Sequence, residues 1–251
     1  MTKKIVLDAK NVYYRQLNER IREAVENGAE EIEIKNVNGQ RYICGAVKGE
    51  QRFLIRGVPG QDMASFMKGP YIRVEGNAQD GVGNTMDDGK VVINGLAGDV
   101  LGYAMRGGRL YVKGDVGYRV GIHMKAYKDK LPVIVIGGKA GDFLGEYMAG
   151  GVIVLLGMFT GNPKAPIAGS SLGTGMHGGV IYVRGGVPKE QIGPGLHSEP
   201  VNKEDKKILA GYLEDYAKEF GLNPKELLAE PFVRIKPFSH RPYGSLYVGT
   251  N

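Results

Sequence analysis

Cysteine, histidine and long apolar runs are scarce in this chain of 251 residues. Its single cysteine, Cys44, excludes an intrachain disulfide and an iron–sulfur cluster held by four cysteines of this chain. The four histidines share no metal-ligand spacing: His123, His177, His197 and His240. No nucleophile carries a local catalytic signature. We therefore expect no catalytic residue and no metal site, and we expect His123 and His177, each beside a methionine, to flank the core.

Membrane and nucleic-acid partners are not expected either. No run of about 18 apolar residues is present, and the polar start MTKKIVLDAK is unlike a signal peptide. This predicts a cytoplasmic protein. The net charge is +6, but basic residues are scattered among acidic ones and form no basic helix or aromatic–arginine platform. No dinucleotide-binding fingerprint precedes a helix, so we expect no cofactor in this chain.

Glycine, in contrast, is abundant, with 40 residues. The aliphatic runs VIVIGG and VIVLLG must be buried, which argues against a disordered glycine-rich chain. The glycines recur, mostly 19 residues apart, in a G-x-x-G-x-x-x-G pattern followed three residues later by methionine. Its leading glycines are Gly57, Gly76, Gly95, Gly114, Gly138, Gly157 and Gly185; later positions hold Gly60, Gly83, Gly98, Gly102, Gly117, Gly121, Gly141, Gly145 and Gly173. A fixed period of this length indicates a repeat architecture.

Each repeat unit contains a short strand. The residues four and two before each leading glycine are apolar, as at Leu110 and Val112 before Gly114, and this alternation predicts one inward face. Such a unit cannot bury its apolar face alone, so successive units must stack. We predict a mainly β fold, a right-handed parallel β-helix of about seven coils over residues 50–187. The glycines then serve sharp bends with positive φ and do not bind phosphate.

Acidic residues recur four positions after some leading glycines, at Asp80, Asp99 and Asp142. Calcium-binding β-rolls need a nine-residue unit, which does not match this period. Some β-helix enzymes use carboxylates on one outer face, and the Asp80–Asp99 pair could imitate them. Turn capping by the aspartate side chains is the simpler interpretation.

The two ends lack the repeat. Residues 1–49 are predicted to form an α/β cap, with a helix over 11–27, a strand beginning EEIEIKNV, a turn at Asn38–Gly39 and a second strand from Tyr42 to Val47 as a hairpin. Residues 188–251 are predicted to form a helical extension, with a helix over 202–220, a short one from Asn223, and a tail. Both ends of a β-helix expose apolar side chains, so caps are required.

Two coils carry insertions, over 126–131 and 158–171. Insertions in solenoids emerge as loops, often on a binding face. The longer one is the better candidate for binding a partner, through Met158, Phe159, Asn162, Pro163 and Pro166. The alternative, that the loop folds back and covers apolar surface, stays open on the sequence alone.

The repeat resembles the C-terminal domain of the glutamate synthase large subunit. The first coil, GVPGQDMASF, places Gly57, Gly60, Gln61 and Phe66 as in that domain's opening coil, and Asn11 and Arg15 match an Asn and Arg that often precede its first helix. Family members usually carry an amidotransferase domain and a flavin and iron–sulfur synthase domain ahead of this one. This chain looks like a stand-alone form of the third domain.

The resemblance implies a scaffold without bond chemistry of its own. The family's reaction adds ammonia from glutamine to 2-oxoglutarate and reduces the product to glutamate. The implied partners are an amidotransferase subunit, a catalytic subunit carrying FMN and an iron–sulfur cluster, and an electron-donor subunit; a homo-oligomer is left open. A similar repeat occurs in the β-helix subunit of formylmethanofuran dehydrogenase, although the Gln61 coil and the N-terminal helix favour glutamate synthase. An independent β-helix enzyme is the third alternative.

Overall fold

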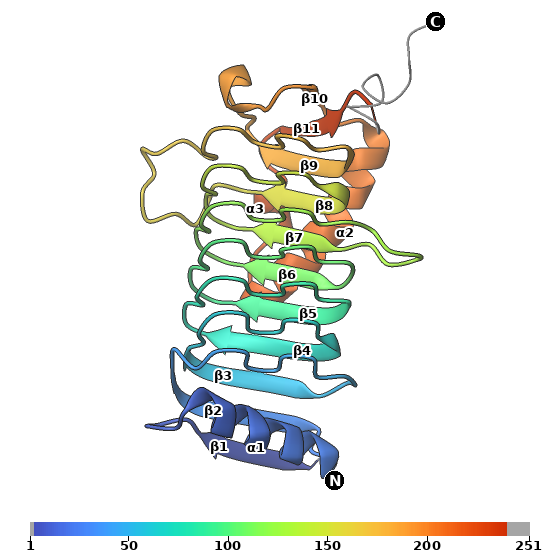
Figure 1. Cartoon of the computed structure of the whole chain (residues 1–251). Coiled ribbons are helices and arrows are strands. Elements are labelled where there is room, and N and C mark those ends of the chain that lie inside the picture. The colour runs from blue at the N-terminus through green and yellow to red at the C-terminus, as the bar shows by residue number, and fades with distance from the viewer. Residues whose placement is uncertain (1–2, 240–251) are drawn as a thin grey trace, which may run out of the picture.

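The computed structural model describes residues 3–239. Within them, eleven strands form one sheet in the order β1-β2-β3-β4-β5-β6-β7-β8-β9-β11-β10. The strands from β1 to β9 are all parallel, and Figure 1 shows them stacked one above another. The first nine are β1 (Lys4–Asp8), β2 (Glu31–Asn38), β3 (Arg52–Val58), β4 (Lys68–Glu75), β5 (Asp88–Ile93), β6 (Arg109–Val112), β7 (Val133–Ile136), β8 (Ala149–Leu155) and β9 (Gly178–Arg184).

The predicted parallel β-helix is thereby confirmed, with a small difference in coil number. The seven strands β3 to β9 are the ones that the leading glycines mark, and they are joined by six turns rather than the seven expected. Each turn returns the chain to the start of the next strand, so equivalent residues align. Leu110, for example, lies between Val91 and Ile134 in adjoining strands.

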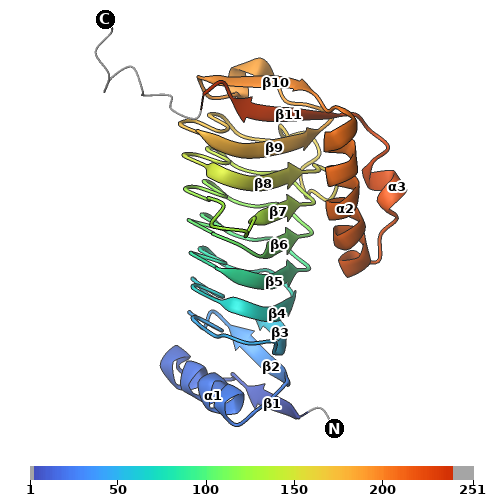
Figure 2. The same cartoon turned by 90° about the vertical axis from the view of Figure 1, so that its right-hand side faces the viewer.

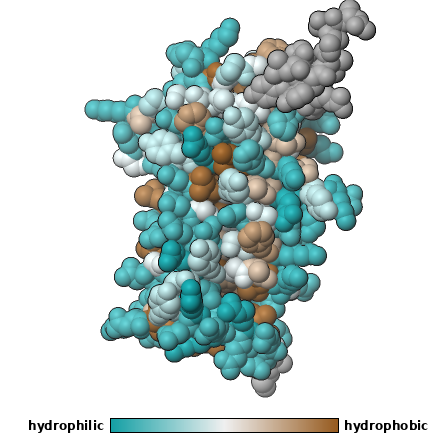
Figure 3. Space-filling view, viewed as in Figure 1, coloured by the Kyte–Doolittle hydropathy of each residue, from teal (hydrophilic) through white to brown (hydrophobic). Residues whose placement is uncertain are grey.

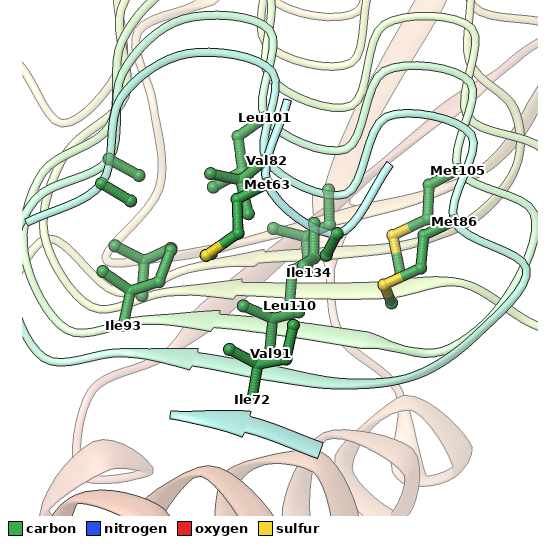
Figure 4. Close-up of a cluster of buried hydrophobic side chains, with 14 of the residues drawn as sticks. Met63, Ile72, Val82, Met86, Val91, Ile93, Leu101, Met105, Leu110 and Ile134 are labelled. Atoms are coloured by element: carbon green, nitrogen blue, oxygen red, sulfur yellow. The ribbon is translucent and has the colours of Figure 1, made fainter. Parts of the chain in front are cut away.

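These aligned residues fill the solenoid. Inward-facing strand residues such as Leu110 and Ile134 meet Leu101 and Met105 from the opposite wall, and all four are fully buried (Figure 4). The methionines of successive coils also stack, and Met86 lies beside Met105 at the same place in the turn. The core is therefore a set of continuous apolar ladders.

We call the wall opposite the strands the back wall; it consists of residues 42–47, 62–67, 81–86, 100–105, 119–124, 143–148 and 171–176. Its backbone alternates into the left-handed region, for example at Val100 (φ 50°), Gly102 (φ 70°) and Ala104 (φ 50°). The N–H groups of Val100 and Ala104 donate hydrogen bonds to Tyr118 O and Ile122 O of the next coil, each with an N···O distance of 2.8 Å. These inter-coil hydrogen bonds offset a conformation that costs a non-glycine residue about 1–2 kcal/mol.

That strain can be tested by removing a methyl group. We expect Ala104→Gly to raise the free energy of unfolding by about 0.5–1 kcal/mol, because glycine adopts positive φ without a Cβ penalty. Ala97→Gly is the matched control. Ala97 lies in a β-bridge without positive φ, so this variant should lower the free energy of unfolding by about 1 kcal/mol. Urea unfolding of both variants measures the difference. Equal decreases in the free energy of unfolding would contradict the claim that Ala104 is strained.

The recurring aspartates cap turns, as predicted, but they do so between coils. Asp80 Oδ1 accepts from the Asp99 N–H at 2.9 Å, and Asp99 Oδ1 accepts from the Tyr118 N–H at 2.8 Å. Asp142 Oδ1 likewise accepts from the Ser170 N–H at 2.7 Å. These carboxylates therefore bond one coil to the next.

The predicted N-terminal hairpin is wrong. Helix α1 (Tyr14–Glu26) and strand β2 form as expected, but β2 pairs in parallel with β1 and β3. Residues 43–46 form a turn, and Tyr42, Cys44 and Ala46 have the positive φ of the back wall. The chain at Asn38 therefore turns a corner of the solenoid, because parallel stacking on β3 already satisfies β2. The helix covers this end with Leu17, Ile21 and Ala24.

The C-terminal extension contains the two expected helices, α2 (Lys203–Phe220) and α3 (Pro224–Leu227). It also contains two strands that the sequence did not predict, β10 (Leu196–Pro200) and β11 (Phe232–Pro237), with a 3-10 helix over Lys189–Gln191 before them. Strand β11 pairs antiparallel with both β9 and β10, so this sheet extension closes the C-terminal end of the stack. The tail from residue 240 lies outside the described residues.

Helix α2 lies against the outer face of the strands, away from the back wall (Figure 2). The single inward face predicted for the strands is therefore wrong in β5 to β9, where outer residues are also buried, under the C-terminal extension. This second apolar cluster combines Val92, Tyr111, Val133, Val135, Val152, Val154 and Tyr182 of the strands with Leu209, Leu213, Tyr216 and Ala217 of α2.

Candidate partner-binding surface

Among residues 3–239 there is no group of three or more His, Cys, Asp or Glu side chains placed to hold a metal ion. Within the same residues, no helix is long and apolar enough to cross a membrane. Cys44 is buried in the core, and burial raises the pKa of its thiol well above the usual range. A neutral, inaccessible thiol is a packing residue rather than a nucleophile.

The base of the 158–171 loop folds back on the molecule. Met158 and Phe159 are half-buried and pack against the apolar cluster under α2, with Phe159 lying over Gly137. Both were candidates for contact with a partner; in the structure they cover apolar surface, as in the alternative that the sequence left open. The reason is that the outer strand face beside them is itself apolar.

The tip of the same loop is exposed at Asn162, Pro163 and Pro166. It projects beyond the coils at one side of the solenoid (Figure 1). The Lys139 ammonium donates to Asn162 O at 2.7 Å and also to Ala165 O. The three exposed candidates are thus presented together on a loop that is fastened to the coil beneath it.

Asp115 binds the N-terminal part of this loop. Its Oδ2 accepts from the Thr160 hydroxyl at 3.1 Å and from the Gly161 N–H at 3.2 Å. Its Oδ1 accepts from the Lys139 N–H at 2.7 Å, which is one of the inter-coil bonds. One aspartate therefore ties the insertion to the regular repeat, and little conformational entropy is left to lose when the tip is bound.

A second surface, on the back wall, was not predicted from the sequence. Five aromatic side chains stand exposed along it, and we call them the aromatic row: Tyr42, Phe66, Tyr103, His123 and Tyr147. Phe66 is 55% exposed, and Tyr147 is 39% exposed. Figure 3 looks onto this wall and shows hydrophobic and pale residues running down it among hydrophilic ones.

Three rings of the aromatic row, those of Tyr103, His123 and Tyr147, contact one another. The His123 and Tyr147 rings are nearly parallel, with centroids 5.3 Å apart and an interplanar angle of 11°. The Tyr103 ring meets His123 edge-on at 5.9 Å. His123 was expected to flank the core, and its side chain is exposed because it lies one residue before the inward-facing Met124.

The aromatic row ends in a hollow beside α1. Tyr14 lies 5.8 Å from Tyr42, between centroids, and the Arg41 guanidinium is 5.0 Å from the Tyr14 ring centroid. Arg15, one of the residues that carry the family resemblance, donates to the Tyr14 hydroxyl at 3.3 Å and lines the hollow together with Phe66. This hydrogen bond lowers the pKa of Tyr14. The hollow combines aromatic rings and cations, which are common at protein interfaces.

A sequence signal for the row exists. Phe66, His123 and Tyr147 each directly precede a methionine of the buried ladder. Because neighbouring back-wall residues point to opposite sides, a residue beside an inward methionine faces solvent. An aromatic residue at that position is therefore exposed, and His123 and Tyr147, which hold it in adjoining coils, stack on each other.

Comparison with known proteins agrees with this architecture. The family model described as the GXGXG motif matches residues 8–238. The chain is also 48% identical over 250 residues to the uncharacterized protein MJ1350 of Methanocaldococcus jannaschii, and the match covers 97% of this chain and 96% of that relative. The chain therefore belongs to the GXGXG motif family, the family of the β-helix domain that ends the glutamate synthase large subunit.

Proposed function

We propose that this chain is a non-catalytic structural component of a glutamate synthase-type assembly. In that assembly it holds an amidotransferase subunit against a synthase subunit that carries FMN and an iron–sulfur cluster. Membership of the GXGXG family over residues 8–238 supports the proposal. The reaction would take ammonia from glutamine, add it to 2-oxoglutarate and reduce the product to glutamate, with electrons from a donor subunit.

The observation that carries the proposal is the aromatic row. Its rings stand on a back wall whose backbone is hydrogen-bonded from coil to coil, as at Ala104 to Ile122 and His123 to Glu146. Exposed aromatic side chains on a rigid base are typical of protein interfaces, because they bury much area at a small entropy cost. A long wall of this kind suits a partner domain better than a small molecule.

The exposed loop tip provides a second contact on another side of the solenoid. Pro163 and Pro166 restrict its backbone, and Lys139 and Asp115 fix its base. Two contact surfaces on one rigid body are what a component that holds two catalytic subunits in register requires. The aromatic row and the loop tip are accordingly assigned to different partners.

Co-purification tests the proposal. The full chain is tagged in its own host and isolated at low salt, and the bound proteins are identified by mass spectrometry. We expect an amidotransferase and a flavin-containing synthase in stoichiometric amounts, and a colourless chain when the partners are removed at high salt. A flavin or iron–sulfur absorption band that stays with the isolated chain would contradict it.

Surface variants then separate the two contacts. Phe66→Ser combined with Tyr147→Ser should weaken one partner by about tenfold or more, because exposed aromatic anchors dominate interfaces. Tyr127→Ser, at a tyrosine 48% exposed in the other insertion, is the matched control and should have no effect. Replacing 162–166 by a short glycine linker, with Phe159 and Ile167 kept, should release the other partner.

The alternatives give different results in the same experiments. Recovery of formylmethanofuran dehydrogenase components would favour the role of that complex's own β-helix subunit. An independent β-helix enzyme would act without partners, and its outer-face carboxylates would be Asp80 and Asp99. Both of these already accept backbone hydrogen bonds between coils, which supports the structural role.

A further inference from the structure

Among residues 3–239, the eleven-stranded sheet ends at strand β1, whose one strand neighbour in this part of the chain is β2. This edge lies at the N-terminal end of the stack in both views (Figures 1 and 2). The side chain of Val6, in the middle of β1, is 52% exposed. An open edge presents unpaired backbone groups that can pair with another strand.

The hydrogen bonds between β1 and β2 define which backbone groups of β1 point toward the open edge. Lys3 O accepts from Glu31 N, and the Ala9 N–H donates to Lys35 O, so residues 3 and 9 point their backbone groups toward β2. In a parallel pair, alternate residues bond to the same neighbour. The N–H and C=O groups of Lys4, Val6 and Asp8 therefore point away from β2, toward the open edge.

The side-chain sequence of the strand, KIVLD, is complementary to itself when reversed. An antiparallel pair centred on Val6 places Val6 opposite Val6 and Lys4 opposite Asp8 of the second copy, twice. These are the residues whose backbone groups face the edge, so each opposed pair can exchange both hydrogen bonds. Opposite charges directly across two strands stabilise the pair, and like charges destabilise it.

We propose that β1 is the docking site for a second copy of this chain, which pairs through its own β1 about a two-fold axis. The dimer joins two solenoids end to end through one continuous sheet. Three features select the same register: the direction of the backbone N–H and C=O groups, the order of the charged residues along β1, and the exposed Val6 at its centre. A five-residue pair is small for a protein interface, so we expect a dissociation constant on the order of tens of micromolar.

Charge variants of the full chain test this register. Sedimentation velocity from about 2 to 500 µM should show a monomer–dimer equilibrium for the natural chain. Lys4→Glu makes both edge charges acidic, and Asp8→Lys makes both basic, so each variant alone should weaken dimerisation by at least tenfold. An equimolar mixture of the two should restore the dimer, because the opposed charges are then complementary.

Three controls keep the result interpretable. Lys203→Glu makes the same charge change as Lys4→Glu but at the start of α2, and should dimerise like the natural chain. Asp8→Lys loses its bonds from Asn36 and Lys10, so its circular dichroism and melting temperature are checked first. Val6→Pro removes an N–H that faces the open edge, and should abolish dimers while the fold is kept.

Two outcomes overturn the proposal. One is a natural chain that stays monomeric up to 500 µM, in which case Lys4 and Asp8 only protect the edge. The other is a dimer that survives in folded Lys4→Glu and Val6→Pro variants, since it must then use another surface. Neither outcome bears on binding of catalytic partners to the back wall, so the proposed scaffold function is tested separately.

Discussion

Gly102→Val is expected to lower the free energy of unfolding by on the order of 2–4 kcal/mol. Gly102 has φ +70°, a conformation that a β-branched residue avoids. An ideal Cβ on Gly102 would also lie 2.5 Å from the Cδ1 atom of Ile134, a side chain that is itself fully buried. The substitution therefore combines backbone strain with overpacking of a core ladder.

Lys113→Val is the control for this change. Lys113 follows β6 and is half-exposed, so adding the same side chain there should change stability by about 0.5 kcal/mol or less. Thermal melts and urea unfolding compare the two variants directly. Equal melting temperatures would show that the bend at Gly102 tolerates a side chain and that the assigned core contact with Ile134 is wrong.

The coils could be predicted from the sequence because each coil makes the same contacts as its neighbour. Gly95, Met105 and Leu110 each have counterparts in most other coils, so one pattern is observed several times over. A β-ladder aligns equivalent residues, and the register then follows from the period alone. Leu110 opposite Ile134 is an example, even though the inserted residues 126–131 lie between them.

The ends could not be predicted in the same way. The strands β10 and β11, LHSEP and FVRIKP, have no counterpart in the repeat. The pairing of β11 with β9, and of β10 with β11, depends on what the last coil leaves open. At the other end, residues after Asn38 combine a turn signal with an alternating segment, which indicates a hairpin. Local sequence does not reveal that β3 already pairs with β2.

The loop tip at Asn162, Pro163 and Pro166 stays a predicted contact. Phe159, predicted with it, packs half-buried on the chain's own outer strand face, because an apolar residue in a loop can face either a partner or the chain's own surface. The outer strand face that receives Phe159 was visible in the run VIVI, in which every residue is apolar. A strand of that kind is buried on both faces.

The second large effect is expected where α2 covers this outer face. Tyr216 is fully buried there, its ring lies edge-on to Tyr111 at 5.7 Å between centroids, and its hydroxyl donates to Val112 O at 3.1 Å. Burial raises the pKa of this phenol, so it stays a neutral donor. Tyr216→Ala should cost about 3–5 kcal/mol, because it leaves a large cavity and removes one of the two hydrogen bonds that Val112 O accepts, the other coming from the Gly137 N–H.

The location of the lost stability shows whether α2 unfolds together with the solenoid core or separately from it. Tyr212→Ala, at a half-buried tyrosine one turn away that contacts Arg109, is the control and should cost about 1 kcal/mol. Hydrogen exchange should show faster exchange in α2 and β6 of the Tyr216→Ala variant, while β3 and β4 stay protected. Equally faster exchange in all strands would mean that the solenoid and α2 unfold as one unit. An unchanged stability would mean that Tyr216 does not contribute to the core.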